Sequence, residues 1–340
     1  MSEIIRLQTT IDKEEYQKYQ ISREKLLSMY RKMLLIRKFE EKIEELYLVK
    51  GVLMGPAHLY NGMEAISVGI SEGLIDGDLV ISNHRGHGHA LSLGIDPYRV
   101  MSEMFGNSEG IEKGLAGSMH VSIEPSKGAL YSSAIVGSQV PIAVGAAYSL
   151  KYYGKHNLVV VFFGDGAVTT GSFLEGLAMG SFLKVPLFLV CEDNHYAEYT
   201  DINYTVGQSK ISKIISSFGI PTVEVDGNDP LAVLKAFKMY EVEVRNWNGP
   251  VAIHAYTYRF GGHSVTDSAN YRSKEEVESW KQRDPILRFK ERLLSEGIAS
   301  EEELNKVNTE IENYINEISE KAAAVKPLDF NEVLKIAGDP

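Results

Sequence analysis

The sequence predicts an α/β fold in which a parallel sheet is flanked by helices. Two wholly apolar runs, at 158–163 and 186–191, have the length of buried strands, and a segment with helical character joins them. The same alternation of strand and helix returns at 222–256. Strands that alternate with helices in this way are typical of βαβ units, which place their strands side by side and parallel.

The length of the chain sets its domain organisation. With 340 residues it is long enough for about two domains or one large α/β domain, and it can bury a core without outside help. No internal repeat or obvious linker divides it. We therefore expect one α/β domain over 21–290, preceded by a polar N-terminal arm (1–20) and followed by a C-terminal helical extension (291–340).

The individual elements follow from periodicity and from capping residues. Apolar residues recur at helical spacing from Ser22 to Lys50, and Gly51 stands where a C-cap glycine is expected. The stretch 51–137, rich in glycine and histidine, predicts loops and short helices wrapped on a scaffold. The remaining predictions are helices at 63–73, 97–105, 140–152, about 164–183 and 230–244, strands at 158–163, 186–191, 222–225 and 251–256, and charged helices from Asp284 to about Lys321.

Composition and charge exclude several classes of protein. Hydrophobic residues make up 44% of the chain and charged residues 24%, which excludes a disordered or fibrous protein. The net charge of −11 disfavours binding to nucleic-acid phosphates or to an anionic membrane. The single cysteine, Cys191, fits a reducing compartment, and no apolar run is long enough to span a membrane. We expect a cytoplasmic protein that binds neither nucleic acid nor membrane.

Polar residues follow two predicted strands at the points where these strands end. Asp165 follows the strand at 158–163, and Asn194 follows the strand at 186–191. The carboxyl ends of parallel strands share one crevice, and both side chains offer the oxygen ligands that magnesium prefers. Gly166 and Ala167 lie at a helix start, where free N–H groups favour a phosphate. A diphosphate bridged by magnesium fits both features.

Three other interpretations of the GDG turn at 164–166 stay open at this point. With Glu192 at the end of the next strand, the turn is similar to a dinucleotide-binding site, but the third glycine of that motif is not at its required position. The stretch 166–172 has the glycine spacing of a phosphate-binding P-loop but lacks its lysine. The third interpretation is a purely structural strand, turn and helix.

Several motifs occur in a fixed order along the chain. GDGA at 164–167 is followed by Asn194 at a spacing of 194 − 165 = 29. The other blocks are HLYNGMEA (58–65), NHRGHGHA (83–90), KGLAGSMH (113–120), IVGSQVPIAVGAA (135–147), CEDNHY (191–196), VDGND (225–229), TYRFGGHSVTD (257–267) and YRSKEEV (271–277). Over about residues 25–290 the chain thus resembles the alpha subunit of the thiamine-diphosphate-dependent first component of 2-oxo acid dehydrogenase complexes, of the pyruvate and acetoin types. The resemblance implies the thiamine-diphosphate-binding fold, with thiamine diphosphate and magnesium as cofactors.

The resemblance also implies roles for individual residues. Magnesium would be bound by Asp165, by the side chain of Asn194 and by the backbone carbonyl of Tyr196. The diphosphate and the rest of the cofactor would be contacted by Gly166 and Ala167 through backbone N–H groups, by the side chains of His84, Arg85 and His263, and by backbone groups of Ala134 and Val136 at the aminopyrimidine ring. A permanently charged guanidinium such as that of Arg85 suits a diphosphate.

Three histidines are the predicted catalytic residues. The resemblance places His58 at the substrate pocket and His84 at the cofactor. His263 follows two glycines after a predicted strand, and an imidazole there has a pKa suited to proton transfer. The spacing of His84, His87 and His89 is also compatible with zinc, although no carboxylate follows at ligand spacing. We expect structural roles for the remaining candidates His156, His195 and His254.

The resemblance further implies an activity and two partners. Family members cleave a 2-oxo acid or acetoin and transfer the acyl unit to a lipoyl group on an acyltransferase component. A separate beta subunit supplies a glutamate that activates the cofactor, so the resemblance implies an α2β2 assembly. An alternative is a relative that keeps the fold without turnover.

Some blocks depart from the usual pattern of the family. GDGAVTTG replaces the commoner GDGA-x-N-(Q/E)-G, Leu115 and Ala116 replace a basic residue and glycine, and EDNHYAEYT replaces ENN-x-Y-G-M. These changes leave the substrate open between pyruvate, acetoin and other 2-oxo acids, with branched-chain acids disfavoured by the HRGHGH and GSMH blocks. Thr266 stands at one acceptor position of a loop that is phosphorylated in animal members, and we predict no regulation from it.

Overall fold

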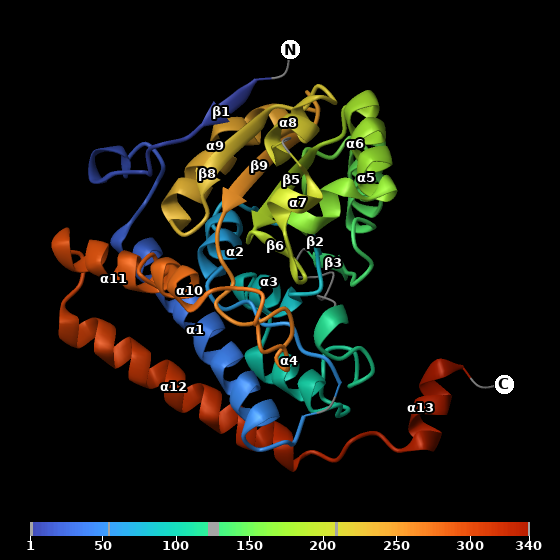
Figure 1. Ribbon diagram of the computed structural model, residues 1–340, viewed down its shortest axis with the longest axis vertical. Coiled ribbons are helices and arrows are strands. Elements are labelled where there is room, and N and C mark those ends of the chain that lie inside the picture. Colours follow the sequence, from blue (N-terminus) through green and yellow to red (C-terminus); the bar gives the residue numbers. More distant parts are fainter. Residues whose placement is uncertain (1–2, 54, 122–128, 208–209, 339–340) are drawn as a thin grey trace.

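The computed structural model of the protein describes residues 3–53, 55–121, 129–207 and 210–338. In this part of the chain seven strands form one sheet whose neighbours are all parallel, in the order β1-β8-β9-β5-β4-β2-β3 (Figure 1). The predicted α/β fold with a parallel sheet is therefore confirmed. The strands are β1 (Ile4–Arg6), β2 (Leu79–Ser82), β3 (Ala129–Ser132), β4 (Val159–Gly164), β5 (Leu187–Asp193), β8 (Thr222–Asp226) and β9 (Val251–Tyr256), and a small hairpin pairs β6 (Tyr196–Ala197) with β7 (Thr200–Asp201).

Helices cover both faces of the sheet. Successive residues of a strand point to opposite faces, so apolar side chains on both faces need to be covered. In β4, Val160 and Phe162 belong to one apolar core, whereas Val159 and Val161 belong to another. Burial on both faces explains why the central strands are wholly apolar in sequence. The helices are α1 (Arg23–Leu48), α2 (Glu64–Ser71), α3 (Gly86–Ser92), α4 (Pro97–Met104), α5 (Gln139–Tyr152), α6 (Gly171–Leu183), α7 (Ile202–Thr205), α8 (Ile211–Ser216), α9 (Pro230–Arg245), α10 (Lys274–Lys281), α11 (Pro285–Ser295), α12 (Glu301–Ala324) and α13 (Phe330–Ala337).

The helices divide between the two cores. The larger core takes side chains from α1 to α4, α9, α11 and α12, and the smaller core takes them from α5, α6 and α8. Helix α1 starts at an N-cap, Ser22, whose hydroxyl accepts from the N–H of Lys25, and the predicted helix at 22–50 is confirmed. Helix α12 lies beside α1, with ion pairs Arg23–Glu303 at 2.7 Å and Arg31–Glu310 at 3.0 Å.

Besides the β6–β7 hairpin, three strands of the main sheet were not predicted from the sequence. The first, β1, lies in the segment expected as an arm and pairs with β8, where Arg6 Nε lies 2.9 Å from Glu224 Oε2. The other two, β2 and β3, lie in the stretch expected to contain loops and short helices. Each is only three or four residues long. Such short runs carry little periodicity, and their pairing with strands remote in the chain is decided by packing.

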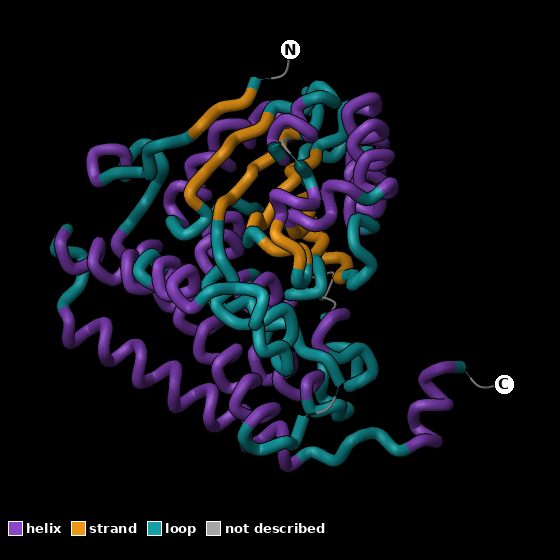
Figure 2. Tube along the Cα trace, viewed as in Figure 1, coloured by secondary structure: helices purple, strands orange, loops and turns teal. Residues whose placement is uncertain are grey.

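Loops gather beyond the carboxyl ends of the central strands (Figure 2). The segments that follow β2, β4, β5 and β9 all reach this region. This is the edge at which open parallel sheets bind ligands.

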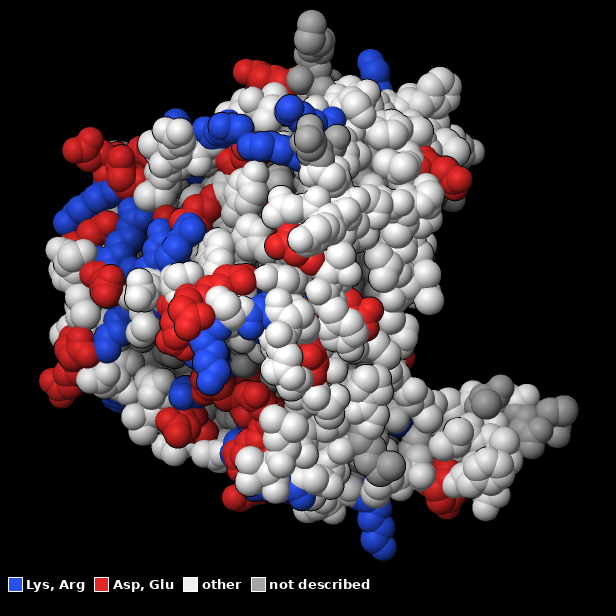
Figure 3. Space-filling view, viewed as in Figure 1, with Lys and Arg blue, Asp and Glu red and all other residues white. Residues whose placement is uncertain are grey.

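The outer surface is uneven in character. Charged side chains crowd the side formed by α1, α10, α11 and α12, whereas the side formed by α5 and α6 carries few (Figure 3). Helix α13 stands apart from the body at the end of an extended segment (Figure 1). Among the described residues, no helix has both the length and the apolar composition required to cross a bilayer.

Candidate functional site

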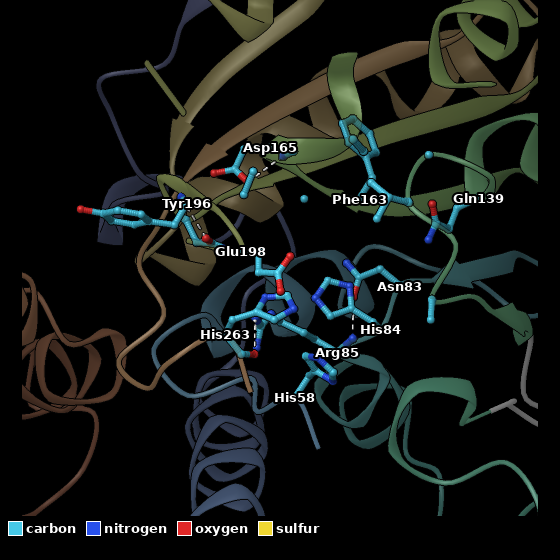
Figure 4. A pocket seen from close by; sticks show the side chains of 18 of the residues that line it. His58, Asn83, His84, Arg85, Gln139, Phe163, Asp165, Tyr196, Glu198 and His263 are labelled. Carbon is cyan, nitrogen blue, oxygen red and sulfur yellow. Dashed lines mark hydrogen bonds between the residues drawn. The ribbon is translucent and has the colours of Figure 1, made fainter. Parts of the chain in front are cut away.

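A cavity of about 300 Å³ lies at the carboxyl ends of the central strands (Figure 4). All of the predicted site residues line it, although they come from segments far apart in the sequence. They are His58, His84, Arg85, Ala134, Val136, Asp165, Gly166, Ala167, Asn194, Tyr196 and His263. The fold therefore brings the complete predicted set into one place.

Asp165 supplies a buried carboxylate at the end of β4. It opens a short 3-10 turn (Asp165–Thr169) that precedes α6, so the GDG turn and the helix are separate elements. Asp165 Oδ1 accepts a hydrogen bond from the N–H of Gly166 at 2.8 Å, whereas Oδ2 is buried with no partner among the described residues. Burial and the neighbouring Asp193 raise the pKa of Asp165 well above its ordinary value. A bound cation would compensate both the buried oxygen and the repulsion.

Asn194 and Tyr196 come shortly after the adjacent strand, β5, and line the same cavity as Asp165. Strands β4 and β5 pair Gly164 with Glu192, so the residues that follow each strand lie side by side. Asn194 Oδ1 accepts from the N–H of Tyr196 at 3.3 Å, which holds the amide close to the β6 strand. A carboxylate, an amide oxygen and nearby backbone carbonyls form a donor set of the kind that magnesium accepts together with phosphate oxygens.

The turn after β4 has room for glycine alone. A Cβ at Gly166 would lie 2.8 Å from the Cβ of Ala197, closer than a normal contact. The backbone of the turn can therefore approach a ligand without an intervening side chain. Both Gly166 and Ala167 line the cavity.

Three buried arginines, of which Arg85 lines the cavity, have no carboxylate partner among the described residues. None of the ion pairs formed by the described residues involves Arg85, Arg259 or Arg272. Arg85 instead donates to the carbonyls of Leu59 (2.6 Å) and His263 (3.0 Å). Burial and the neighbouring Arg259 lower the pKa of Arg85 to about 9.

Arg259 was not among the predicted site residues. Its Nη2 donates to the carbonyl of Glu198 at 2.6 Å, and its Nε is buried with no partner among the described residues. It lies within the TYRFGGHSVTD block, but only its burial and its position close to Arg85 show that it adds to an excess of positive charge. Uncompensated buried cations favour an anionic ligand at this site.

The three predicted catalytic histidines form one cluster. The ring centroid of His58 lies 5.1 Å from that of His84 and 4.8 Å from that of His263. The centroids of His84 and His263 are 5.6 Å apart. Burial and the charge of Arg85 lower the pKa of His58 to about 3 and that of His263 to about 4, and they also lower the pKa of His84. All three imidazoles are thus neutral near pH 7.

A buried network holds the turn that carries His84 and Arg85. Asn83 Nδ2 donates to Glu192 at 2.7 Å, and Asn83 Oδ1 accepts from the N–H of Arg85 at 2.8 Å. Glu192 also accepts from the hydroxyl of Tyr60. Asn83 itself lines the cavity and was missed by the sequence analysis, since an asparagine after a short unpredicted strand gives no distinctive signal.

The histidines of the possible zinc motif face different partners. His87 Nδ1 lies 3.0 Å from Glu40, whereas His89 Nε2 lies 3.0 Å from Glu192, and only His84 lines the cavity. No group of three His, Cys, Asp or Glu side chains in the described part of the chain is arranged to hold a metal. The zinc alternative therefore has no geometric support.

The histidines expected to be structural lie outside the cavity. His254 Nε2 lies 2.7 Å from Asp193 Oδ2, and His195 Nδ1 lies 3.8 Å from Asp193 Oδ1. Although burial alone would raise the pKa of Asp193, the hydrogen bond with His254 holds it below its ordinary value. His156 stacks on Trp247 at the surface, with ring centroids 4.9 Å apart.

The comparisons with known proteins agree on one family. The model of the family described as "Dehydrogenase E1 component" matches residues 31–330. The pyruvate dehydrogenase E1 component subunit alpha of Rhizobium meliloti is 38% identical over 315 residues, covering 92% of this chain and 90% of the relative. The alpha subunit of the acetoin:2,6-dichlorophenolindophenol oxidoreductase of Bacillus subtilis is 41% identical over 305 residues, covering 89% of each chain.

A third relative, the pyruvate dehydrogenase E1 component subunit alpha of Zymomonas mobilis, is 39% identical over 319 residues, or 93% of this chain and 89% of the relative.

The fold and the site define an α/β protein that binds an anionic cofactor at the carboxyl edge of a parallel sheet. The chain belongs to the dehydrogenase E1 component family, among the alpha subunits of the thiamine-diphosphate-dependent pyruvate and acetoin dehydrogenases. This membership argues against the dinucleotide and P-loop interpretations of the GDG turn.

Proposed function

We propose that the cavity at Asp165 binds the magnesium and diphosphate of thiamine diphosphate, and that the subunit uses it to cleave a pyruvate-like 2-oxo acid or acetoin. The acyl unit then passes to a lipoyl group on an acyltransferase component. The observation that carries the assignment of the site is the buried, unpartnered Oδ2 of Asp165. A bound cation would satisfy this buried carboxylate oxygen.

The residues present fit this cofactor. Asp165, the amide oxygen of Asn194 and the carbonyl of Tyr196 would bind magnesium, and the backbone N–H groups of Gly166 and Ala167 would bind the diphosphate. The positive charge of Arg85 and Arg259 would balance the diphosphate. His84, His263, and the backbone groups of Ala134 and Val136 complete the predicted contacts, and His58 faces the space left for the substrate.

Thiamine diphosphate supplies, when bound, a nucleophilic carbon and a sink for the electron pair released on bond cleavage. The histidines of the cavity would transfer protons next to the bound cofactor. As neutral imidazoles, His58, His84 and His263 can each accept a proton at the unprotonated ring nitrogen and then release one from the imidazolium that forms. Buried side chains such as those of His58, Arg85 and Asp165 limit the access of water from their side of the cavity, whereas Val136, which also lines it, is exposed.

An exposed apolar face supports assembly with a beta subunit in an α2β2 complex. Tyr148 and Tyr152 on α5 and Met179 and Phe182 on α6 are exposed, with Phe182 at 83%. Tyr148 and Met179 line a shared groove between the two helices. Proteins seldom expose apolar side chains together in this way unless another chain covers them. The face carries few charges (Figure 3), as the centre of a subunit interface does.

The beta subunit would also complete the chemistry. In the family it supplies the glutamate that activates the aminopyrimidine ring, so we propose that this chain is inactive alone. The proposal includes a cytoplasmic location, supported by the single buried Cys191. It also keeps the expected division into an arm (1–20), the cofactor domain (21–290) and a helical extension (291–340).

The proposal is tested by calorimetric titration of thiamine diphosphate and magnesium into the chain co-expressed with its beta-type subunit. We expect binding that requires the metal, followed by dye reduction with pyruvate or acetoin as substrate. Binding without turnover of any 2-oxo acid or hydroxyketone supports the alternative of a relative that has lost catalysis. Absence of cofactor binding contradicts the assignment of Asp165 and Asn194.

A further inference from the structure

The proposed function assigns no role to one carboxylate that lines the cavity. Glu198 lines the cavity together with His84 and His263. In Figure 4 its carboxylate points into the cavity on the side of His263. None of the ion pairs formed by the described residues involves this side chain.

The backbone at Glu198 adopts a conformation that is unfavourable for a residue with a side chain. Glu198 and Tyr199 form the two-residue turn between β6 and β7, in which Ala197 pairs with Thr200. The φ angle of Glu198 is +57°, a left-handed conformation that residues other than glycine seldom adopt. Arg259 fixes this turn by donating to the carbonyl of Glu198 at 2.6 Å. Two-residue hairpin turns commonly require such a φ, so the turn and its hydrogen bond with Arg259 fix the position from which Glu198 reaches the cavity.

The charges that line the cavity restrict the substrate. Arg85 is the single arginine or lysine that lines it, within the described residues, and the proposed function assigns Arg85 to the diphosphate. The three lining histidines are neutral near pH 7, as described above. Once the cofactor is bound, this chain therefore offers the substrate neutral imidazoles and the negative charge of Glu198.

The two candidate classes of substrate differ in charge. A 2-oxo acid is an anion and is repelled by a carboxylate close to its binding site, although the exposure of Glu198 to solvent screens part of this repulsion. An α-hydroxyketone such as acetoin is neutral and has a hydroxyl group that can donate a hydrogen bond to a carboxylate. Hydrogen bonds to charged acceptors are stronger than those between neutral groups.

We infer that Glu198 determines specificity, and that this site takes a neutral α-hydroxyketone in preference to an anionic 2-oxo acid. The carboxylate accepts a hydrogen bond from the substrate hydroxyl and excludes substrates that carry a carboxylate of their own. This inference rests on the proposed function, because it assumes that the diphosphate occupies Arg85. It refines that function by naming the substrate class.

Two substitutions separate the charge of Glu198 from its capacity to accept a hydrogen bond. Glu198→Gln removes the charge and keeps an acceptor oxygen, whereas Glu198→Met removes both. Glu275→Gln is the matched control, since Glu275 is an exposed carboxylate on α10 that does not line the cavity. All variants are prepared as the complex with the beta-type subunit, loaded with thiamine diphosphate and magnesium.

Binding is measured first by calorimetry with two esters of acetylphosphonate that have nearly equal shape. These are the monomethyl ester, an anion, and the neutral dimethyl ester. We expect both Glu198 variants to bind the anion about tenfold more tightly than the wild type, because one nearby repulsive charge is removed. The affinity for the neutral ester, and both affinities of the Glu275→Gln control, stay unchanged.

Steady-state kinetics gives a second readout. The wild type is expected to have a higher kcat/KM for acetoin than for pyruvate. The KM for acetoin should rise about tenfold in Glu198→Met and less in Glu198→Gln, which still accepts a hydrogen bond.

The inference is overturned if the anionic probe binds equally well to wild type and both variants, or if the wild type prefers pyruvate. Its failure is distinct from failure of the proposed function. In the first case the complex still binds thiamine diphosphate and magnesium before any probe is added, whereas failure of the proposed function abolishes that binding as well.

Discussion

The guanidinium of Arg85 donates a hydrogen bond to the backbone carbonyl of His263 at 3.0 Å, although 178 residues separate the two in the sequence. A second hydrogen bond, to the carbonyl of Leu59, brings the segment of His58 to the same point. One buried side chain thereby joins the segments that carry all three cavity histidines. The planar fork of arginine makes both bonds possible at once.

Arg85→Lys should therefore weaken both the fold and the site. Lysine keeps the positive charge but cannot reach both carbonyls in the same geometry, so one buried carbonyl loses its donor. We expect a loss of about 1–3 kcal/mol in the free energy of unfolding and about tenfold weaker cofactor binding. Urea denaturation and calorimetry measure the two effects. Unchanged cofactor affinity in a stable variant would remove Arg85 from the diphosphate site.

Asp165→Asn should abolish binding of thiamine diphosphate that depends on magnesium. The amide has nearly the same shape but lacks the charge that a divalent cation requires. The apoprotein should remain as stable as the wild type or become more stable, because the repulsion between Asp165 and Asp193 disappears. Calorimetry of cofactor binding and thermal unfolding check the two parts. Residual metal-dependent binding at wild-type affinity would contradict the assignment.

Glu103→Gln should destabilise the loop that precedes the cavity residue Met119. The buried carboxylate of Glu103 accepts four backbone hydrogen bonds at 2.8–3.1 Å, from the N–H groups of Glu112, Gly114, Ala116 and Gly117. A glutamine has one acceptor oxygen and leaves about two of these N–H groups without a partner, at a cost of about 2–4 kcal/mol. The measurement is the urea midpoint.

Glu109→Gln serves as the control for Glu103→Gln. Its carboxylate lies in the same loop region but accepts from the hydroxyl of Tyr98 rather than from several backbone groups. We expect a smaller loss of stability there. Equal losses in the two variants would mean that the backbone hydrogen bonds of Glu103 contribute little.

The pH dependence of stability should reflect His58. Burial and Arg85 lower its pKa to about 3 in the folded protein, whereas the pKa of a histidine in the unfolded chain is about 6.5. Between these values the unfolded chain binds a proton that the folded chain does not, so stability falls as the pH falls. The contribution of one such group is at most about 1.4 kcal/mol per pH unit.

His58→Gln should accordingly make the loss of stability between about pH 6 and pH 4 less steep. Urea denaturation at several pH values measures the slope. His156→Gln, at the surface beside Trp247, is the control and should leave the slope as it is. An unaltered slope in His58→Gln would show that His58 is not buried as a neutral imidazole.

Phe182→Glu should prevent assembly with the beta subunit and leave the fold of this chain intact. Phe182 is 83% exposed on α6, so the substitution costs the isolated chain little, but it places a charge in the centre of the proposed interface. Val49→Glu is the control, since Val49 is 79% exposed at the far end of α1. Sedimentation of the co-expressed subunits measures the effect. Wild-type assembly of Phe182→Glu would place the interface elsewhere.

Much of the site was predictable because it depends on local sequence. The apolar runs of β4 and β5 identify buried strands, and Asp165 and Asn194 follow directly from the positions where these strands end. The ordered motifs then gave the family and the positions of His58, Arg85 and His263. Short strands such as β2 were not predictable, because their pairing is decided by residues far along the chain.

The sequence by itself determined the class of fold, the family, and the residues that line the cavity, because apolar runs, turn residues and ordered motifs are local patterns. Only the tertiary structure decided the electrical character of the site. It placed His58 and His263 in contact, gave Arg259 no carboxylate partner within the described ranges, and directed Glu198 into the cavity. Charge and pKa depend on burial and on neighbours, and packing alone determines both.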